Sequence, residues 1–233
     1  MNSIYQKNET VVLWGDSLGK GVVWNTERNR HTYAQETAAK VAERELDIHI
    51  INRARFGYTA PQGLALMERD LENGVTADAA VIEFGGNDSN FDWAAISENP
   101  EAEHLPNTLP HVFAETLRRM VTLLRDKGIR PILMTLPPID ADKYFKFLVG
   151  DKLNAQHILQ WLGDKQRIYR YQEMYSLLIE RVARQMQCAL VDLRQVCLFD
   201  RNMFCLICDD GLHLTEEGQR YVGARIAELV REG

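Results

Sequence analysis

The chain has 233 residues, enough for one domain with a sizeable core, and 45% of them are apolar, which excludes a disordered chain. The formal net charge is −6 with no basic stripe, and this argues against a nucleic-acid partner. The first ten residues lack the apolar core of a secretory signal, and no apolar run is long enough to span a membrane. We therefore expect a cytoplasmic protein without a membrane span.

Apolar runs of strand length alternate along the chain with segments of helical periodicity. The predicted strands are 10–16, 47–53, 79–84, 130–136 and 189–193, and the predicted helices are 33–46, 62–72, 112–127, 171–187 and 215–231. The strands are almost continuously apolar, as expected when helices cover both faces of a sheet. The pattern predicts an α/β fold over residues 1–233, a single αβα sandwich domain around a five-stranded parallel sheet.

Two stretches, 89–110 and 137–170, are too long for ordinary connections. They follow the third and fourth predicted strands, so both insertions should lie over the same end of the sheet, where α/β proteins bind ligands. The second insertion is rich in aromatic residues. It is equally compatible with an acyl pocket, a sugar-stacking wall or packing against a second subunit, so a homo-oligomer stays open.

The first predicted strand ends in Gly15-Asp16-Ser17-Leu18-Gly19. Neither a P-loop nor a dinucleotide-binding pattern fits the glycine spacing here. The segment does match G-x-S-x-G, the nucleophile elbow of α/β-hydrolases. Only sixteen residues precede Ser17, however, which leaves no room for the oxyanion loop of that fold. A lone serine at a strand end is also often just a helix cap.

Other predicted strand ends carry groups that suit the same chemistry. Gly57 follows the second strand and offers a backbone N–H with no side chain in the way, and Asn87 follows the third strand in Gly85-Gly86-Asn87-Asp88. Near the C-terminus, Asp210 stands three residues before His213, within reach of its ring. A serine, an oriented histidine and donors for an oxyanion are together typical of acyl transfer.

These four segments resemble, in order and spacing, the four sequence blocks of the SGNH (GDSL) hydrolase superfamily. The resemblance implies Ser17 as the nucleophile, His213 as the base and Asp210 as the acid that orients it. It also implies an oxyanion hole made by the Ser17 and Gly57 N–H groups and the Asn87 side-chain amide. The fold implied is a flavodoxin-like three-layer sandwich with strand order 2-1-3-4-5.

The reaction implied by the resemblance is hydrolysis of a small-molecule carboxylic ester through an acyl-enzyme, with no cofactor and no metal. The superfamily includes lipases, lysophospholipases, thioesterases and sugar deacetylases, and the sequence does not choose among them. Arg53 and Arg55 flank the second block, and the sequence leaves open whether they meet substrate. The alternative interpretation is a catalytically inactive flavodoxin-like binding or interaction module.

The four cysteines offer a competing metal or redox interpretation, because Cys205 and Cys208 have C-x-x-C spacing. A structural zinc site needs about four ligands, and no second pair of ligands lies nearby in the sequence. We therefore expect the thiols of Cys188, Cys197, Cys205 and Cys208 to be reduced and to fill space in the core.

Overall fold

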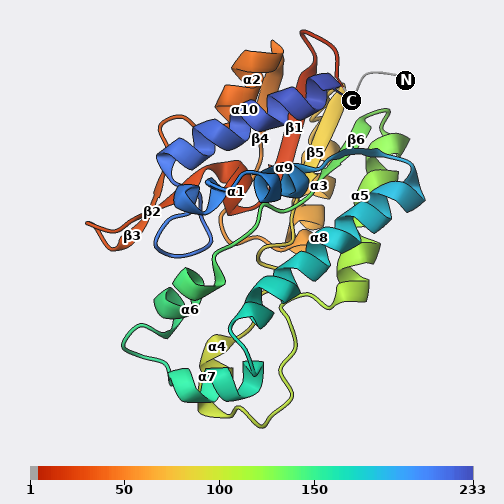
Figure 1. Ribbon diagram of the computed structural model, residues 1–233. Helices are drawn as coiled ribbons and strands as arrows, with labels where there is room; N and C mark the ends of the chain where they lie inside the picture. The colour runs from red at the N-terminus through yellow and green to blue at the C-terminus, as the bar shows by residue number, and fades with distance from the viewer. Residues whose placement is uncertain (1–4, 233) are drawn as a thin grey trace.

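The computed structural model describes residues 5–232, which are built around a five-stranded parallel sheet (Figure 1). Its strands are β1 (Thr10–Gly15), β4 (His49–Asn52), β5 (Ala79–Glu83), β6 (Arg130–Met134) and β7 (Ala189–Val191). The order in the sheet is β4-β1-β5-β6-β7. Numbered along the chain within this sheet, that order is 2-1-3-4-5, so the predicted fold class is confirmed.

The register of the sheet places the ends of its two central strands side by side. Strand β1 pairs in parallel with β4 on one side and β5 on the other, and Gly15 lies opposite Glu83 at the carboxyl end. The residues that follow β1 and β5 therefore leave the sheet from the same point.

Helices cover both faces of the sheet (Figure 1). On one face lie α2 (Ala38–Leu46), α9 (Leu193–Phe199) and α10 (Glu216–Glu232), which share an apolar cluster with β1, β6 and β7. On the other face lie α3 (Ala60–Glu72), α5 (Pro110–Asp126) and α8 (Gln166–Met186). None of the helices within the described residues is both long and apolar enough to cross a bilayer.

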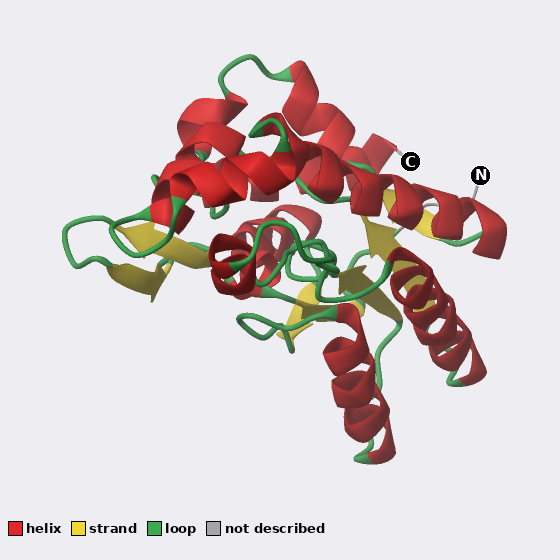
Figure 2. Cartoon of the chain, turned by 90° about the horizontal axis from the view of Figure 1, so that it is seen from below, coloured by secondary structure: helices red, strands yellow, loops and turns green. Residues whose placement is uncertain are grey.

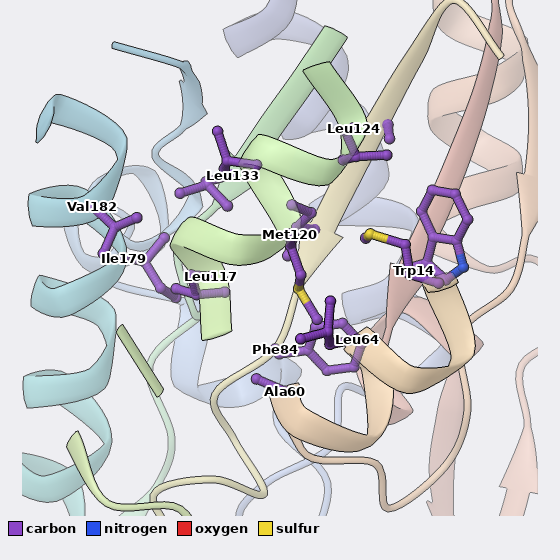
Figure 3. Packing of buried hydrophobic residues seen from close by; sticks show 14 of the residues in the cluster. Trp14, Ala60, Leu64, Phe84, Leu117, Met120, Leu124, Leu133, Ile179 and Val182 are labelled. Atoms are coloured by element: carbon purple, nitrogen blue, oxygen red, sulfur yellow. The ribbon is translucent and has the colours of Figure 1, made fainter. Parts of the chain in front are cut away.

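The core on the α3, α5 and α8 face contains the largest buried side chains (Figure 3). Trp14 from β1 and Phe84 after β5 are almost fully buried, and Met120 from α5 is fully buried. Full burial of one such side chain contributes about 1.5–3 kcal/mol to folding. The Trp14 indole Nε1–H donates to Asp70 Oδ2 at 3.0 Å, so the polar atom of this buried ring is satisfied.

Local signals in the sequence define where the helices begin. Thr59 and Gln62 form a capping box at the start of α3, and Thr37 caps α2 by accepting from the Lys40 backbone N–H. Pro110 occupies the first position of α5, where its missing N–H has no helical partner to lose. These residues therefore define where α2, α3 and α5 begin.

The expected helix over 33–46 is wrong at its start. Residues Arg30–Tyr33 form strand β3, which pairs antiparallel with β2 (Val22–Asn25) in a hairpin, and α2 begins only at Ala38. The hairpin projects from the body of the molecule (Figures 1 and 2). It follows the single helical turn α1 (Ser17–Lys20), which Gly21 ends with a left-handed φ of 76°.

The stretches expected as loop insertions contain helices. Stretch 89–110 carries α4 (Trp93–Glu98), and stretch 137–170 carries α6 (Ala141–Val149), α7 (Ala155–Leu162) and the start of α8. They pack together at one end of the molecule (Figure 1) around a third apolar cluster, which includes Phe91, Trp93, Tyr144, Phe145 and Ile158. Their aromatic residues therefore bury one another instead of forming an irregular surface. A short 3₁₀ helix, η1 (Met203–Leu206), precedes the last turn before α10.

We predict that Gly63→Ala destabilises the protein, although alanine normally stabilises a helix interior by about 1 kcal/mol. A Cβ at this position of α3 would collide with the ring of Phe84, which is itself buried. Overpacking of this kind costs about 1–3 kcal/mol, so thermal unfolding should show a lower Tm. The exposed Ala65→Gly variant measures helix propensity alone, and a raised Tm for Gly63→Ala would contradict the predicted packing.

Candidate active site

Ser17 lies at the carboxyl end of β1, as the first residue of α1. Asp16 caps this turn, and its Oδ1 accepts from the Leu18 N–H at 3.1 Å. The Ser17 side chain is partly exposed and lines a cavity at this edge of the sheet. Sheet and cap together hold the hydroxyl in place at the edge where α/β folds bind ligands.

A buried carboxyl group lies beneath the Ser17 turn. Glu83 Oε2 accepts from the Asp16 N–H at 3.1 Å and from the Gly19 N–H at 3.0 Å. A Cβ at Gly15 would lie 2.5 Å from this oxygen, and one at Gly19 would lie 3.0 Å from it. The two glycines around Ser17 are therefore explained by the close approach of Glu83 to the backbone.

The environment of Glu83 favours its neutral form. Burial raises the pKa of Glu83 well above its ordinary value, and the charge of neighbouring Asp16 raises it further. Burial also raises the pKa of Asp16, against the opposing effect of its hydrogen bond from the Leu18 N–H. The nucleophile turn thus rests on a carboxyl group that keeps its proton.

His213 connects Ser17 to Asp210. Its Nε2 lies 2.9 Å from Ser17 Oγ, and its Nδ1 lies 2.6 Å from Asp210 Oδ2. The ring is buried, with 9% of the residue exposed, and Asp210 is fully buried. The structure therefore brings together three residues that the sequence analysis predicted to work together, from opposite ends of the chain.

Asp210 is held by its own turn. Its Oδ1 accepts from the backbone N–H groups of Leu212 at 3.1 Å and His213 at 3.0 Å. Burial alone would raise the pKa of Asp210, but the hydrogen bond and charge of His213, together with these two N–H groups, hold it below its usual range. Gly211 allows the backbone of α6 to pack directly on this turn, where a Cβ would meet the Tyr144 backbone.

The neighbouring Asp209 faces elsewhere. Its Oδ2 accepts from the Thr26 hydroxyl at 2.7 Å, at the tip of the β2–β3 hairpin, and its side chain is exposed. Adjacent residues in this turn point in different directions, so only Asp210 reaches the His213 ring. The two acids therefore have distinct structural roles.

Of the two other predicted oxyanion donors, Asn87 lies against the turn that carries Ser17, whereas Gly57 does not line the cavity. Asn87 Nδ2 donates to Asp16 Oδ2 at 3.2 Å and to the Tyr58 carbonyl at 3.0 Å, so both of its hydrogens have partners. Gly57 has a φ of 79° and is exposed, next to Phe56, which lines the cavity. The left-handed φ explains why glycine stands here.

The cavity beside Ser17 has a volume of about 450 Å³, within the range of small-molecule sites. Its lining includes aromatic residues of α4 and α6, among them Trp93, Tyr144 and Phe147. No lysine or arginine is among its lining residues. Arg53, which the sequence left open as a substrate contact, instead pairs with Asp70, its Nε donating to Oδ2 at 2.8 Å.

Sequence reasoning missed two polar residues that contact this site. Glu83 ends an apolar strand, and an acid at the end of such a strand was a signal that could have found it. His31 lies on β3, and its Nε2 is 3.3 Å from Asp210 Oδ2. The sequence around His31 carried no motif, because the hairpin lies outside the four blocks.

Two groups of side chains bear on whether the protein could bind a metal: the cysteines noted in the sequence and one group at the site. Among the described residues, His31, Asp210 and His213 form the one group of histidines, cysteines and acids close enough to share an ion, and hydrogen bonds already join these atoms. All four cysteines are free thiols. Cys208 fills space against Val23, as expected, whereas Cys205 is exposed.

Comparison with known proteins matches residues 13–221 to the GDSL-like Lipase/Acylhydrolase family. The chain belongs to this family. The protein is therefore a GDSL-type carboxylic ester hydrolase.

Relatives of this GDSL chain include named esterases. The isoamyl acetate-hydrolyzing esterase 1 homolog of Bos taurus is 28% identical over 189 residues, which cover 78% of this chain and 69% of that protein. The arylesterase of Vibrio mimicus is 24% identical over 234 residues, covering 99% and 93%. The crystal structure of the lipase/acylhydrolase from Enterococcus faecalis has a TM-score of 0.65 at 20% identity and covers 96% and 95% of the two chains, which shows the shared fold.

We predict that Glu83→Gln keeps the fold and most of the activity, because a neutral amide oxygen can still accept from the Gly19 N–H. Glu83→Ala should lose about 1–3 kcal/mol of stability, the cost of a buried donor left without a partner. Chemical denaturation of both variants measures this difference. Equal losses in the two variants would contradict the assigned contact.

Glu83 also predicts how the stability of the fold depends on pH. The unfolded chain releases the Glu83 proton near the ordinary pKa of 4.5, whereas in the folded protein burial holds the proton to a higher pH. The folded state then binds more protons, so stability should fall as pH rises above about 4.5. Denaturation between pH 5 and about 9 should show a shallower fall for Glu83→Gln than for the natural protein.

Proposed function

We propose that this esterase cleaves its substrate through an acyl-enzyme formed on Ser17. His213 Nε2 removes the Ser17 proton as Oγ attacks the carbonyl carbon of the ester. Asp210 accepts from Nδ1, fixes the tautomer of the ring and stabilises the imidazolium that forms. His213 then protonates the leaving alcohol. In the second half it takes a proton from a water molecule that attacks the acyl carbon, and it returns that proton to Ser17 Oγ as the bond from Oγ to the acyl carbon breaks and the acid leaves.

One observation carries this proposal: a continuous chain of hydrogen bonds at the wall of the cavity. The chain runs from Ser17 Oγ through His213 to Asp210, with separations of 2.9 and 2.6 Å. The acid end is buried and the serine end opens on the cavity. A module that only binds a ligand would gain nothing from such an oriented proton path.

The proposed oxyanion hole uses the backbone N–H groups of Ser17 and Gly57 and the amide of Asn87. Donors that are fixed before the reaction stabilise the charge that develops on the carbonyl oxygen. The Asn87 amide already lies beside the nucleophile turn, held by Asp16 and Tyr58. In this scheme one of its hydrogens turns from the neutral Tyr58 carbonyl to the negatively charged oxyanion.

The lining of the cavity favours a neutral ester of small or moderate size. The described lining holds acids, two histidines and aromatic rings but no lysine or arginine, so it favours a neutral substrate over one with phosphate or carboxylate groups. Side chains of α4 and α6 line the cavity, whose volume of about 450 Å³ suits a short acyl chain better than a long one. Two relatives point the same way by name, one as an isoamyl acetate-hydrolyzing esterase homolog and one as an arylesterase.

Ser17→Ala should reduce turnover of an activated ester by at least about 10³-fold, because no other group on the cavity wall replaces an activated hydroxyl. The fold should survive, since the substitution removes one partly exposed oxygen. A fluorophosphonate should label the natural protein once, at Ser17, as read by peptide mass spectrometry. Labelling that persists in Ser17→Ala would place the nucleophile elsewhere.

Asp210→Asn and Asp209→Asn form a matched pair for the acid. The first removes the charge that faces His213 and should lower kcat strongly, by up to about 10⁴-fold. The second keeps an oxygen that can accept from Thr26 and should stay within about twofold of the natural kcat. If Asp209→Asn is the more damaging variant, the assignment of the acid is wrong.

We expect acetyl and butyryl esters of one chromogenic alcohol to be cleaved faster than the palmitoyl ester. The bounded cavity excludes most of a long chain from apolar contact, so added methylenes stop contributing to kcat/KM. A series of chain lengths, each measured below its critical micelle concentration, tests this. A steady rise in kcat/KM up to palmitoyl would indicate an open lipid groove instead.

A further inference from the structure

Asp210 has a second imidazole neighbour that belongs to none of the four sequence blocks. His31 Nε2 lies 3.3 Å from Asp210 Oδ2, the same oxygen that His213 Nδ1 approaches to 2.6 Å. The centroids of the two histidine rings are 4.9 Å apart, with their planes at 67°. His31 is therefore in direct contact with both ends of the acid–base pair.

The other side of the His31 ring is packed among aromatic residues. Trp24 on β2 lies with its centroid 4.9 Å away, Phe56 at 5.1 Å, and Phe147 on α6 at 6.4 Å. The titratable groups that face the ring are Asp210 and His213, both from the last turn before α10. Burial, followed by the charge of His213, lowers the pKa of His31, which keeps the ring neutral near pH 7.

A neutral His31 fits the remaining acceptor site of Asp210. A carboxylate has about four lone-pair positions, and two are used by the N–H groups of Leu212 and His213 on Oδ1. Since Asp210 Oδ2 already accepts from His213 Nδ1, a second donor on that oxygen completes the set. His31 supplies it if its proton is on Nε2.

The β2–β3 hairpin that carries His31 is fixed to both halves of the site. Its base follows directly from the Ser17 turn, and the Ala34 N–H donates to the Gly21 carbonyl at 2.8 Å. Its tip is tied to the acid turn by the Thr26 hydroxyl, which donates to Asp209 at 2.7 Å. Val23 packs on Cys208 in the same turn. The hairpin thus holds the imidazole at a defined distance from Asp210.

We propose that His31 is a positioning residue, which donates from Nε2 to Asp210 Oδ2 and holds that carboxylate in register with His213. The inference rests on the proposed function of Ser17, His213 and Asp210. Loss of the donor would leave more of the negative charge of Asp210 Oδ2 to His213, so the carboxylate would pair more strongly with the His213 imidazolium. Turnover would fall, and more of the enzyme would carry a protonated base at mildly acidic pH.

The test compares variants that separate the hydrogen bond from the ring packing. His31→Phe keeps an aromatic ring beside Trp24 and Phe147 but has no donor, whereas His31→Gln loses the ring and keeps an N–H₂ at the position of Nε2. We expect His31→Phe to lower kcat about tenfold on a short activated ester, with KM changed less than twofold. His31→Gln should recover most of that loss.

The pH profile of kcat/KM gives the second readout. In His31→Phe the acid limb should move to higher pH by at least about half a unit, because the carboxylate then stabilises the protonated base more strongly. In His31→Gln it should stay close to that of the natural enzyme. If His31→Phe does not fold, as judged by its Tm, His31→Met serves as the variant without a donor.

Natural kcat and an unmoved acid limb in the donor-free variant would overturn the proposal. A variant His31→Gln that is as impaired as His31→Phe, or an effect confined to KM, would also overturn it and assign the ring to packing or substrate contact. Ser17→Ala, measured in parallel, distinguishes failure of the His31 proposal from failure of the proposed function. Activity retained in Ser17→Ala would reject the function itself, whatever the His31 variants do.

Discussion

The site depends on the buried carboxyl group of Glu83, which accepts two backbone N–H groups from the turn that carries Ser17. Parallel pairing of β1 and β5 puts Glu83 opposite Gly15, so the sheet register itself delivers this contact. The approach is so close that a Cβ at Gly15 would collide with Glu83, and one at Gly19 would be in unusually tight contact with it. A turn held in this way cannot relax, and a fixed hydroxyl and N–H are what acyl transfer requires.

Around that turn, the other residues of the proposed site come from segments outside the central sheet. The acid and base share one tight turn before α10, against which the backbone of α6 packs at Gly211. The hairpin reaches the same turn from the other side through Thr26 and His31. The two insertions and the hairpin thus complete the proposed site. Access of substrate to Ser17 therefore depends on parts of the chain that lie outside the central sheet.

The sequence predicted the sheet and its order because strands buried on both faces leave a continuous apolar signal, as in residues Thr10–Gly15. It predicted that the residues after β1 and β5 would share one edge because parallel strands end there. His213 lies in the turn after η1 instead of at a strand end, and its pairing with Ser17 was expected from the family resemblance. The sequence did not predict the β2–β3 hairpin, whose short strands alternate weakly, or the helices of the insertions, whose apolar residues are satisfied only by one another. His31 escaped notice because its role depends on a contact 179 residues away in the sequence.

The proposed reaction requires Ser17 as the nucleophile, and it requires the Ser17 N–H, the Gly57 N–H and the Asn87 amide to receive the oxyanion. The most direct measurement is a crystal structure of the protein inactivated by a small alkyl phosphonate, whose tetrahedral phosphorus mimics the intermediate. The account predicts a bond from Ser17 Oγ to phosphorus and one phosphoryl oxygen about 2.7–3.1 Å from all three donors. A phosphoryl oxygen that points to solvent, with Asn87 still bound to Asp16 and Tyr58, would contradict it.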